Sequence, residues 1–281
     1  MRSGYFRILP ALLTALCGAL LSSPAPAADP QRVVSLGGPI TEIVYALGAG
    51  DRLVGADASS IYPAAAEKLP KVGYYRGFAV EGVIGLQPQL VLASDQAGPP
   101  AAMAQLQKLG IPVLVLSAEP TLEGLEQRLE GVAKALGLGN AGHEQVARIR
   151  AEVSRLTQTR SKQSVLLLSA HSGKLQAAGE GTAADALLRL TGARNLFADK
   201  GYKPLSAEAA AALQPEVIVT TTLSVEANGG IKGFLAQPGI AVTPAARNGR
   251  LVVMDDLLLL GFGPRLPEAL RELQAGLAAR P

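Results

Sequence analysis

A segment of fourteen residues occurs twice in this chain, and the two copies constrain the possible folds more than any other feature. The first copy covers residues 79–92 and the second covers residues 206–219, an offset of 127 residues. Each copy has an early glutamate (Glu81 or Glu208), a Leu-Gln-Pro stop that ends a predicted helix, and an apolar run typical of a strand. Two helix–strand junctions could agree by chance, but the matched glutamates favour two related lobes.

Short apolar strands alternate with helices on both sides of one long, polar-rich helix predicted at 141–159. Before it, the patterns predict strands at 32–36, 53–56, 90–93 and 113–116, and helices at 41–47, 80–86, 101–109 and 121–136. After it, they predict strands at 165–169, 217–220 and 251–254, and helices at 183–190 and 266–277. This alternation is typical of α/β lobes with mostly parallel sheets, so we expect one helix to join two α/β lobes.

The first 27 residues have the pattern of a secretory signal peptide. Two arginines and an apolar run at residues 8–21 precede a stretch of small residues that ends at Ala27. We therefore predict cleavage near Ala27 and export to the periplasm. The predicted organisation is a signal peptide over 1–27, an N-terminal α/β lobe over 28–138, a linker helix over 139–162 and a C-terminal α/β lobe over 163–281.

Composition excludes several classes of function. The only cysteine, Cys17, lies in the predicted signal peptide, so the mature chain has no thiolate metal site and no cysteine nucleophile. Removal of that peptide leaves 24 basic and 23 acidic residues, which gives no electrostatic case for nucleic-acid binding. Two histidines and no Gly-x-Ser-x-Gly motif make an exported hydrolase a remote alternative. We expect no enzymatic activity, and a monomer.

Tyr74 and Arg76 place a phenol and a guanidinium two residues apart, just after a proline and a glycine. A tyrosinate is a hard anionic ligand that suits ferric iron, and tyrosine is one of the axial ligands that proteins offer to haem. A neighbouring arginine would favour the ionised phenol. The alternative is that these are ordinary aromatic residues of a loop.

The chain resembles the periplasmic substrate-binding proteins of ABC importers for haem, in the wider class that carries siderophores and cobalamin. The segments and residues that carry the likeness are 32–36, 41–43, 47–55, 57, 62–63, 69–74, 76, 81 and 259–265. The resemblance implies two Rossmann-like α/β lobes joined by a single long rigid helix, with the ligand cleft between the lobes. It also implies that one haem or two are captured in the ferric state and delivered to an inner-membrane ABC permease dimer with its ATPase.

The same resemblance assigns roles to residues of both lobes. Tyr74 would be the haem-iron ligand with Arg76 close to its phenol, and Glu81 and Glu208 would engage the permease, one from each lobe. Arg265 is a candidate partner for a haem propionate or, alternatively, a residue that holds its own loop. The remaining candidates to line the cleft are Tyr75, Phe78, Tyr202 and Phe262.

His171 follows the predicted strand at 165–169, and the carboxyl ends of such strands face the cleft of an α/β protein. It is therefore a second candidate for the iron or the haem pocket, with a loop histidine that binds nothing as the alternative. The segments shared by the whole class do not choose among cargoes, so a ferric siderophore or cobalamin remains the alternative to haem.

Overall fold

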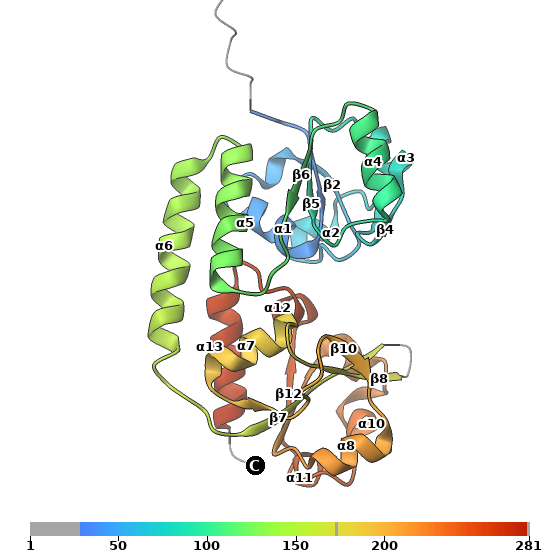
Figure 1. Ribbon diagram of the computed structural model, residues 1–281, viewed down its shortest axis with the longest axis vertical. Coiled ribbons are helices and arrows are strands. Elements are labelled where there is room, and N and C mark those ends of the chain that lie inside the picture. Colours follow the sequence, from blue (N-terminus) through green and yellow to red (C-terminus); the bar gives the residue numbers. More distant parts are fainter. Residues whose placement is uncertain (1–28, 172–173, 280–281) are drawn as a thin grey trace, which may run out of the picture.

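We analysed a computed structural model of the chain, which describes residues 29–171 and 174–279. The predicted signal peptide and its cleavage site lie outside the described residues. The two-lobed α/β fold predicted from the sequence is confirmed: two sheets, each with its own helices, lie at opposite ends of an elongated molecule (Figure 1). Within the described residues, no helix is both long enough and apolar enough to cross a membrane.

The N-terminal lobe is built on a four-stranded parallel sheet in the order β2-β1-β5-β6. Its strands are β1 (Val33–Leu36), β2 (Leu53–Ala56), β5 (Leu90–Ser94) and β6 (Val113–Leu116). Its helices are α1 (Gly38–Ala46), η1 (Gly50–Arg52), α2 (Ala64–Glu67), α3 (Val80–Gly85), α4 (Pro100–Lys108) and α5 (Leu122–Ala135). A separate antiparallel hairpin consists of β3 (Gly73–Tyr74) and β4 (Gly77–Phe78).

The C-terminal lobe combines a parallel core with an antiparallel extension that the sequence patterns did not predict. Strands β7 (Ser164–His171), β11 (Val217–Thr221) and β12 (Leu251–Met254) are parallel, and β9 (Arg194–Asn195) joins β7. Strands β8 (Lys174–Ala178) and β10 (Tyr202–Pro204) continue the sheet in antiparallel fashion. The helices are α7 (Ala183–Thr191), α8 (Ala207–Leu213), α9 (Thr222–Glu226), α10 (Gly230–Leu235), α11 (Pro244–Arg247), α12 (Asp256–Leu260) and α13 (Leu266–Ala278).

The internal repeat of the sequence is a repeat of structure. Helix α3 leads into β5 and helix α8 leads into β11, and each of these strands lies between two others of its sheet. Both helix–strand junctions use the same unusual backbone: Gln87 has φ 48° and Gln214 has φ 45°. A non-glycine residue rarely adopts positive φ, so its presence at matched positions supports two related lobes.

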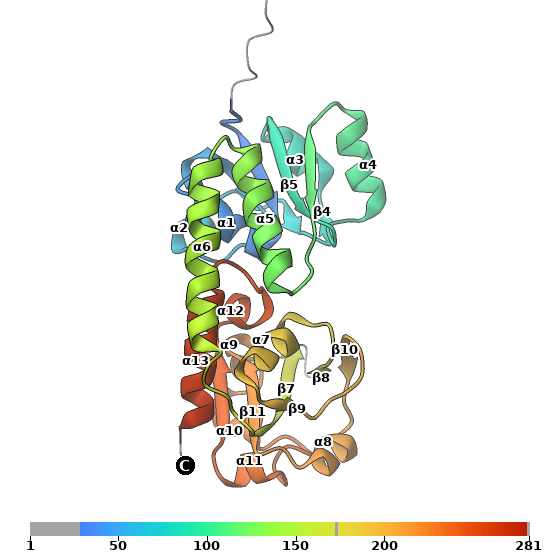
Figure 2. The ribbon, with the colours of Figure 1, turned by 60° about the vertical axis from the view of Figure 1, so that its left-hand side comes forward.

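Helix α6 (Gly139–Leu156) connects the lobes along one side of the molecule (Figure 2). Its buried residues Ile149 and Val153 are four positions apart and therefore lie on one face of the helix. That face belongs to a hydrophobic cluster that also includes Leu129 of α5 and Leu273 of α13. Because this cluster contains residues of both sheets, the lobes share a core along α6.

Candidate ligand-binding site

The carboxyl ends of the two sheets face each other. Gly38 comes two residues after the end of β1, and Leu257 comes three residues after the end of β12. These two positions touch, because a Cβ added to Gly38 would lie 2.7 Å from the Leu257 side chain. Ligands of open α/β sheets bind outside the carboxyl ends of the strands, so the space beside this contact is where a ligand site is expected.

The β3–β4 hairpin carries the predicted ligand Tyr74 at this edge of the N-terminal lobe. Gly73 makes the hairpin possible, because its φ is +100° and a Cβ there would approach Gly77 O to 3.3 Å. The backbone of the hairpin is bound on two sides, with Ala58 N donating to Gly73 O at 2.7 Å and Gly98 N donating to Tyr75 O at 2.9 Å. The hairpin is therefore held by neighbouring loops and not by its own two short strands alone.

Asp57, which is completely buried, fixes the loops around the hairpin. Its Oδ1 accepts from Gly37 N at 2.8 Å and from Ser60 Oγ at 2.9 Å. Its Oδ2 accepts from the backbone and hydroxyl of Ser59, at 2.8 and 2.6 Å, and from Tyr75 N at 3.3 Å. A buried carboxylate requires such partners, and here they join the turn after β1 to the backbone next to Tyr74.

Tyr74, Tyr75 and Arg76 follow one another in the hairpin, and Arg76 is directed at Tyr75. Its guanidinium carbon lies 5.2 Å from the centroid of the Tyr75 ring, and its Nη2 donates to Gln96 Oε1. The rings of Tyr74 and Tyr75 are 4.6 Å apart and inclined at 59°. Tyr74 is 50% exposed, whereas Tyr75 is partly buried. Burial, with a smaller contribution from Tyr74, raises the pKa of Tyr75 to about 12, so Tyr75 is a poor source of tyrosinate.

Tyr202 faces this group from the other lobe. It is 42% exposed, yet burial raises its pKa to about 12, against the lowering effect of the Arg76 charge. The two observations agree if the ring lies in an opening that is walled by protein and still open to solvent. The charge of Arg76 and the phenol of Tyr74 both act on the Tyr202 phenol, so the three groups interact electrostatically across the lobes; that they line one cleft stays a prediction.

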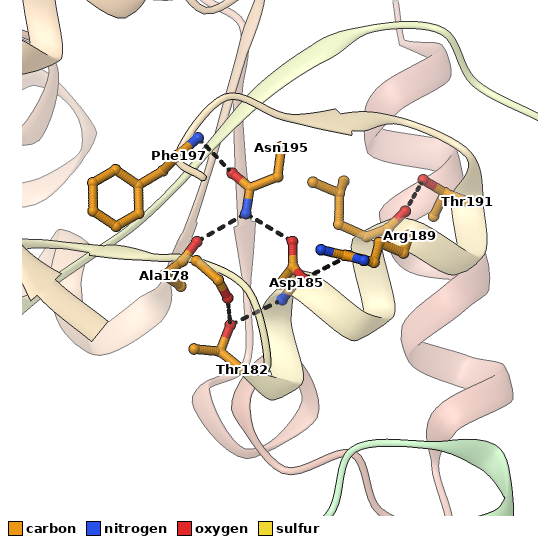
Figure 3. Close-up of polar contacts among 9 residues, drawn as sticks. Ala178, Thr182, Asp185, Arg189, Thr191, Asn195 and Phe197 are labelled. Atoms are coloured by element: carbon orange, nitrogen blue, oxygen red, sulfur yellow. Dashed lines mark hydrogen bonds and ion pairs between the residues drawn. The ribbon is translucent and has the colours of Figure 1, made fainter. Parts of the chain in front are cut away.

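A buried polar network holds the strand next to Tyr202 (Figure 3). Tyr202 pairs with Ala178 of β8. Ala178 O in turn accepts from Asn195 Nδ2 at 2.9 Å, and the same nitrogen donates to Asp185 Oδ1 at 2.9 Å (Figure 3). Thr182 caps helix α7 by accepting from Asp185 N at 3.2 Å. The network makes the position of Tyr202 a consequence of the fold of this lobe.

Two predicted cleft residues belong to the hydrophobic core instead. Phe78 is 5% exposed and packs among residues of β1, α3 and β5, and Phe262 is 4% exposed within the cluster that runs along α6. The prediction that they line the cleft is therefore wrong for these side chains. The sequence could not show that these two side chains are buried, because their burial depends on packing between segments that are distant in the chain.

Arg265 is bound to a buried carboxylate of the other lobe. Its Nε donates to Glu42 Oε1 at 2.9 Å and its Nη2 to the same oxygen at 2.5 Å. Its guanidinium carbon also lies 3.6 Å from the centroid of the Tyr62 ring. The interpretation of Arg265 as a propionate partner is thus corrected, because its donors are directed at Glu42 and its charge is already paired.

Burial raises the pKa of Glu42 from its ordinary value of 4.5 to about 7, against the lowering effect of the bond to Arg265. Between these two pH values the folded protein holds a proton that the unfolded chain has released, so the stability contributed by this group falls as the pH rises. We expect wild type to lose up to about 3 kcal/mol relative to Glu42→Gln between pH 5 and 8, at about 1.4 kcal/mol for each pKa unit. Urea unfolding at a series of pH values measures this difference, and parallel curves for the two proteins would contradict it.

Glu81 and Glu208 occupy equivalent places in the two lobes. Each lies in the first turn of its helix, α3 or α8, and each is exposed. Hydrogen bonds from its own backbone and from Ser206 lower the pKa of Glu208. The backbone of His171 ends β7 opposite Lys174, but its side chain lies outside what the structure describes.

The sequence patterns assigned no role to three further residues. Gln96 follows β5 and binds Arg76, and Glu42 binds Arg265. Leu223 follows β11, at the carboxyl edge of the sheet, and is 51% exposed. The one signal in the sequence that could have singled out Leu223 is its position just after a predicted strand. Among the described residues, no group of three or more His, Cys, Asp or Glu side chains could hold a metal ion.

Comparisons with known proteins agree with the two-lobed fold. The periplasmic haem-binding protein RhuT from Roseiflexus sp. RS-1 superimposes with a TM-score of 0.84 at 38% identity, covering 88% of this chain and 97% of RhuT. The periplasmic haem-binding protein BhuT in complex with two haems gives 0.81 at 40% identity, covering 88% and 99%. A vitamin B12-binding protein of Vibrio campbellii is 31% identical over 205 residues, 71% of this chain and 74% of that protein.

The family model for periplasmic binding proteins matches residues 33–258, which takes in both sheets and the helix between them. The chain belongs to the periplasmic binding protein family.

Proposed function

We propose that this protein captures haem between its lobes in the periplasm and delivers it to an inner-membrane ABC permease. The observation that carries the proposal is Tyr74, a half-exposed phenol at the carboxyl edge of one sheet, with Tyr202 facing it from the other lobe. The proposal is also supported by the likeness of this chain to solved haem-binding proteins at 38–40% identity. The family and the solved relatives are substrate-binding transport proteins, which agrees with a function in capture and not in catalysis.

The residues at the opening suit a ferric porphyrin. Tyr74 would supply an anionic oxygen for the iron, and the phenols of Tyr75 and Tyr202, which stay protonated because their pKa values are about 12, would donate hydrogen bonds to propionates. Arg76 can release Gln96 and pair with a carboxylate. Leu223 offers an exposed apolar surface to a porphyrin face. The stoichiometry is one haem or two.

A spectroscopic titration tests the cargo. Addition of haemin to the exported chain is expected to give a saturable Soret band shifted from that of free haemin, with the end point reporting one or two equivalents. Cyanocobalamin at the same concentrations is the matched comparison, since a relative at 31% identity is a vitamin B12-binding protein. Tight binding of cyanocobalamin with no change in the haemin spectrum would replace haem by a corrinoid as the cargo.

Delivery is assigned to the two matched glutamates. Glu81 and Glu208 project from equivalent helices of two related lobes, so they can meet equivalent basic groups on a two-fold symmetric permease dimer. Charge pairs of this kind set register and association rate more than affinity. The predicted signal peptide, with cleavage near Ala27, places this encounter in the periplasm.

A further inference from the structure

The segment from α12 to α13 makes an unusually close contact with the start of α1. A Cβ on Gly38 would lie 2.6 Å from Ser59 O and 2.7 Å from the Leu257 side chain, and a Cβ on Gly263 would lie 2.8 Å from Glu42 Oε2. A side chain at Gly38 would clash with Ser59 O of its own lobe and displace the end of the Leu257 side chain, and one at Gly263 would displace the Glu42 carboxylate, so the two lobes are closely packed here. Figures 1 and 2 show α12 at the junction between the lobes.

Two arginines cross this junction. Arg265, at the start of α13, binds Glu42 of α1 through two donors, and the side chains are 13% and 3% exposed. Arg128 of α5 donates from Nη2 to Phe262 O at 2.8 Å. Its Nη1 donates to Ser117 O and Glu119 O, which belong to the same lobe as Arg128. The N-terminal lobe therefore holds residues 262–265 in two ways: through the ion pair with Arg265 and through a hydrogen bond to the backbone carbonyl of Phe262.

The energetics of the pair indicate what it contributes. In many proteins the free energy lost by removing two charges from water exceeds the attraction that they gain as a buried pair. A buried ion pair is therefore weak evidence for stability. The raised pKa of Glu42 shows this cost here, since ionisation next to Arg265 is still disfavoured. A pair that adds little to stability can still fix one arrangement, because an alternative spacing of the lobes would leave both charges buried and unpaired.

We propose that Glu42 and Arg265 form an interlobe latch that fixes the spacing of the lobes and so keeps the cleft residues of the C-terminal lobe opposite Tyr74. They act as positioning residues, and their effect on haem rests on the proposed function. The pair does not contact the ligand; it joins the two lobes that form the walls of the proposed site. Arg128 reinforces the latch by holding Phe262 O.

The latch predicts that affinity falls without a loss of stability. In Glu42→Leu/Arg265→Met, apolar side chains replace the pair, so the unfolding temperature is expected to stay equal or rise. Haemin affinity, measured at pH 8, is expected to fall on the order of 10-fold, as for other residues that orient a metal site. The control is Glu126→Gln, which breaks the Arg150–Glu126 pair between α5 and α6 and leaves the junction intact. A variant that binds haemin as wild type does would overturn the positioning role.

Interlobe distances test the latch without any cargo. Spin labels on Gln107→Cys of α4 and Lys232→Cys of α10 occupy exposed helix positions in opposite lobes, and Cys17 lies in the predicted signal peptide. We expect a single narrow distance distribution in the parent and a broader or shifted one in Glu42→Leu/Arg265→Met. An unchanged distribution would refute the latch whatever happens to haemin. A broadened distribution in a protein that binds no haemin would leave the latch standing and refute the proposed function.

Discussion

Tyr74→Phe is expected to weaken haemin binding on the order of 100-fold or more, which corresponds to about 2.7 kcal/mol. The substitution removes the phenol oxygen and leaves the ring, so the apolar contact with Tyr75 is preserved. Half of the Tyr74 side chain is exposed, and substitutions at such surface positions change stability by about 0.5 kcal/mol or less. Loss of binding would therefore report loss of the ligand atom and not loss of the fold.

Tyr75→Phe and Tyr202→Phe are the matched controls for Tyr74→Phe. Each removes one phenol from the same opening, but burial disfavours ionisation of both, with pKa values of about 12. We expect affinity losses within about 10-fold for each, as for hydrogen bonds to a ligand worth about 1 kcal/mol. The visible spectrum separates the roles, since only Tyr74→Phe should remove the tyrosinate-to-iron charge-transfer band. An unchanged spectrum in Tyr74→Phe, with a changed one in Tyr202→Phe, would move the iron ligand to the other lobe.

Local patterns were sufficient for most of the fold. The Leu-Gln-Pro stops located the ends of α3 and α8, because proline disfavours helix at the residue before it, and the structure places left-handed Gln87 and Gln214 at those points. Apolar runs located the central strands, and amphipathic spacing located α6. The two-residue strands of the β3–β4 hairpin were not predicted, since they are too short to show alternation.

Residue roles at the lobe junction could not be predicted in the same way. Arg265 and Glu42 are 223 positions apart, so nothing local in the sequence indicates that they meet. A glycine-rich segment that ends in arginine is equally consistent with a ligand site and with close packing of two lobes. The structure decides for packing, because Phe262 and Glu42 are both buried there. Tyr74 and Arg76 could be proposed from the sequence because their spacing is local, within one hairpin.

Charge reversal at both matched glutamates, Glu81→Lys with Glu208→Lys, is expected to abolish haem uptake and leave haemin affinity unchanged. Both carboxylates are exposed in the first turns of equivalent helices. Lysine there would repel the basic groups that we propose on the permease, and like charges across an interface cost several kcal/mol. Each reversal also opposes the helix dipole, at about 0.3–1 kcal/mol, so folding is checked by thermal unfolding.

The matched control is Glu123→Lys, which reverses an exposed glutamate in the first turn of α5, outside the internal repeat. Uptake is measured as growth on haemin as the iron source, or as stimulation of the permease ATPase in vesicles by the haem-loaded protein. Each single reversal should reduce uptake partly and make it more sensitive to salt, because one lobe still docks and exposed charges are screened within about 8–10 Å. Full uptake in the double variant would show that the two lobes meet the permease through other surfaces. Loss of uptake in Glu123→Lys as well would show that total charge, and not the position of the two carboxylates, governs the encounter.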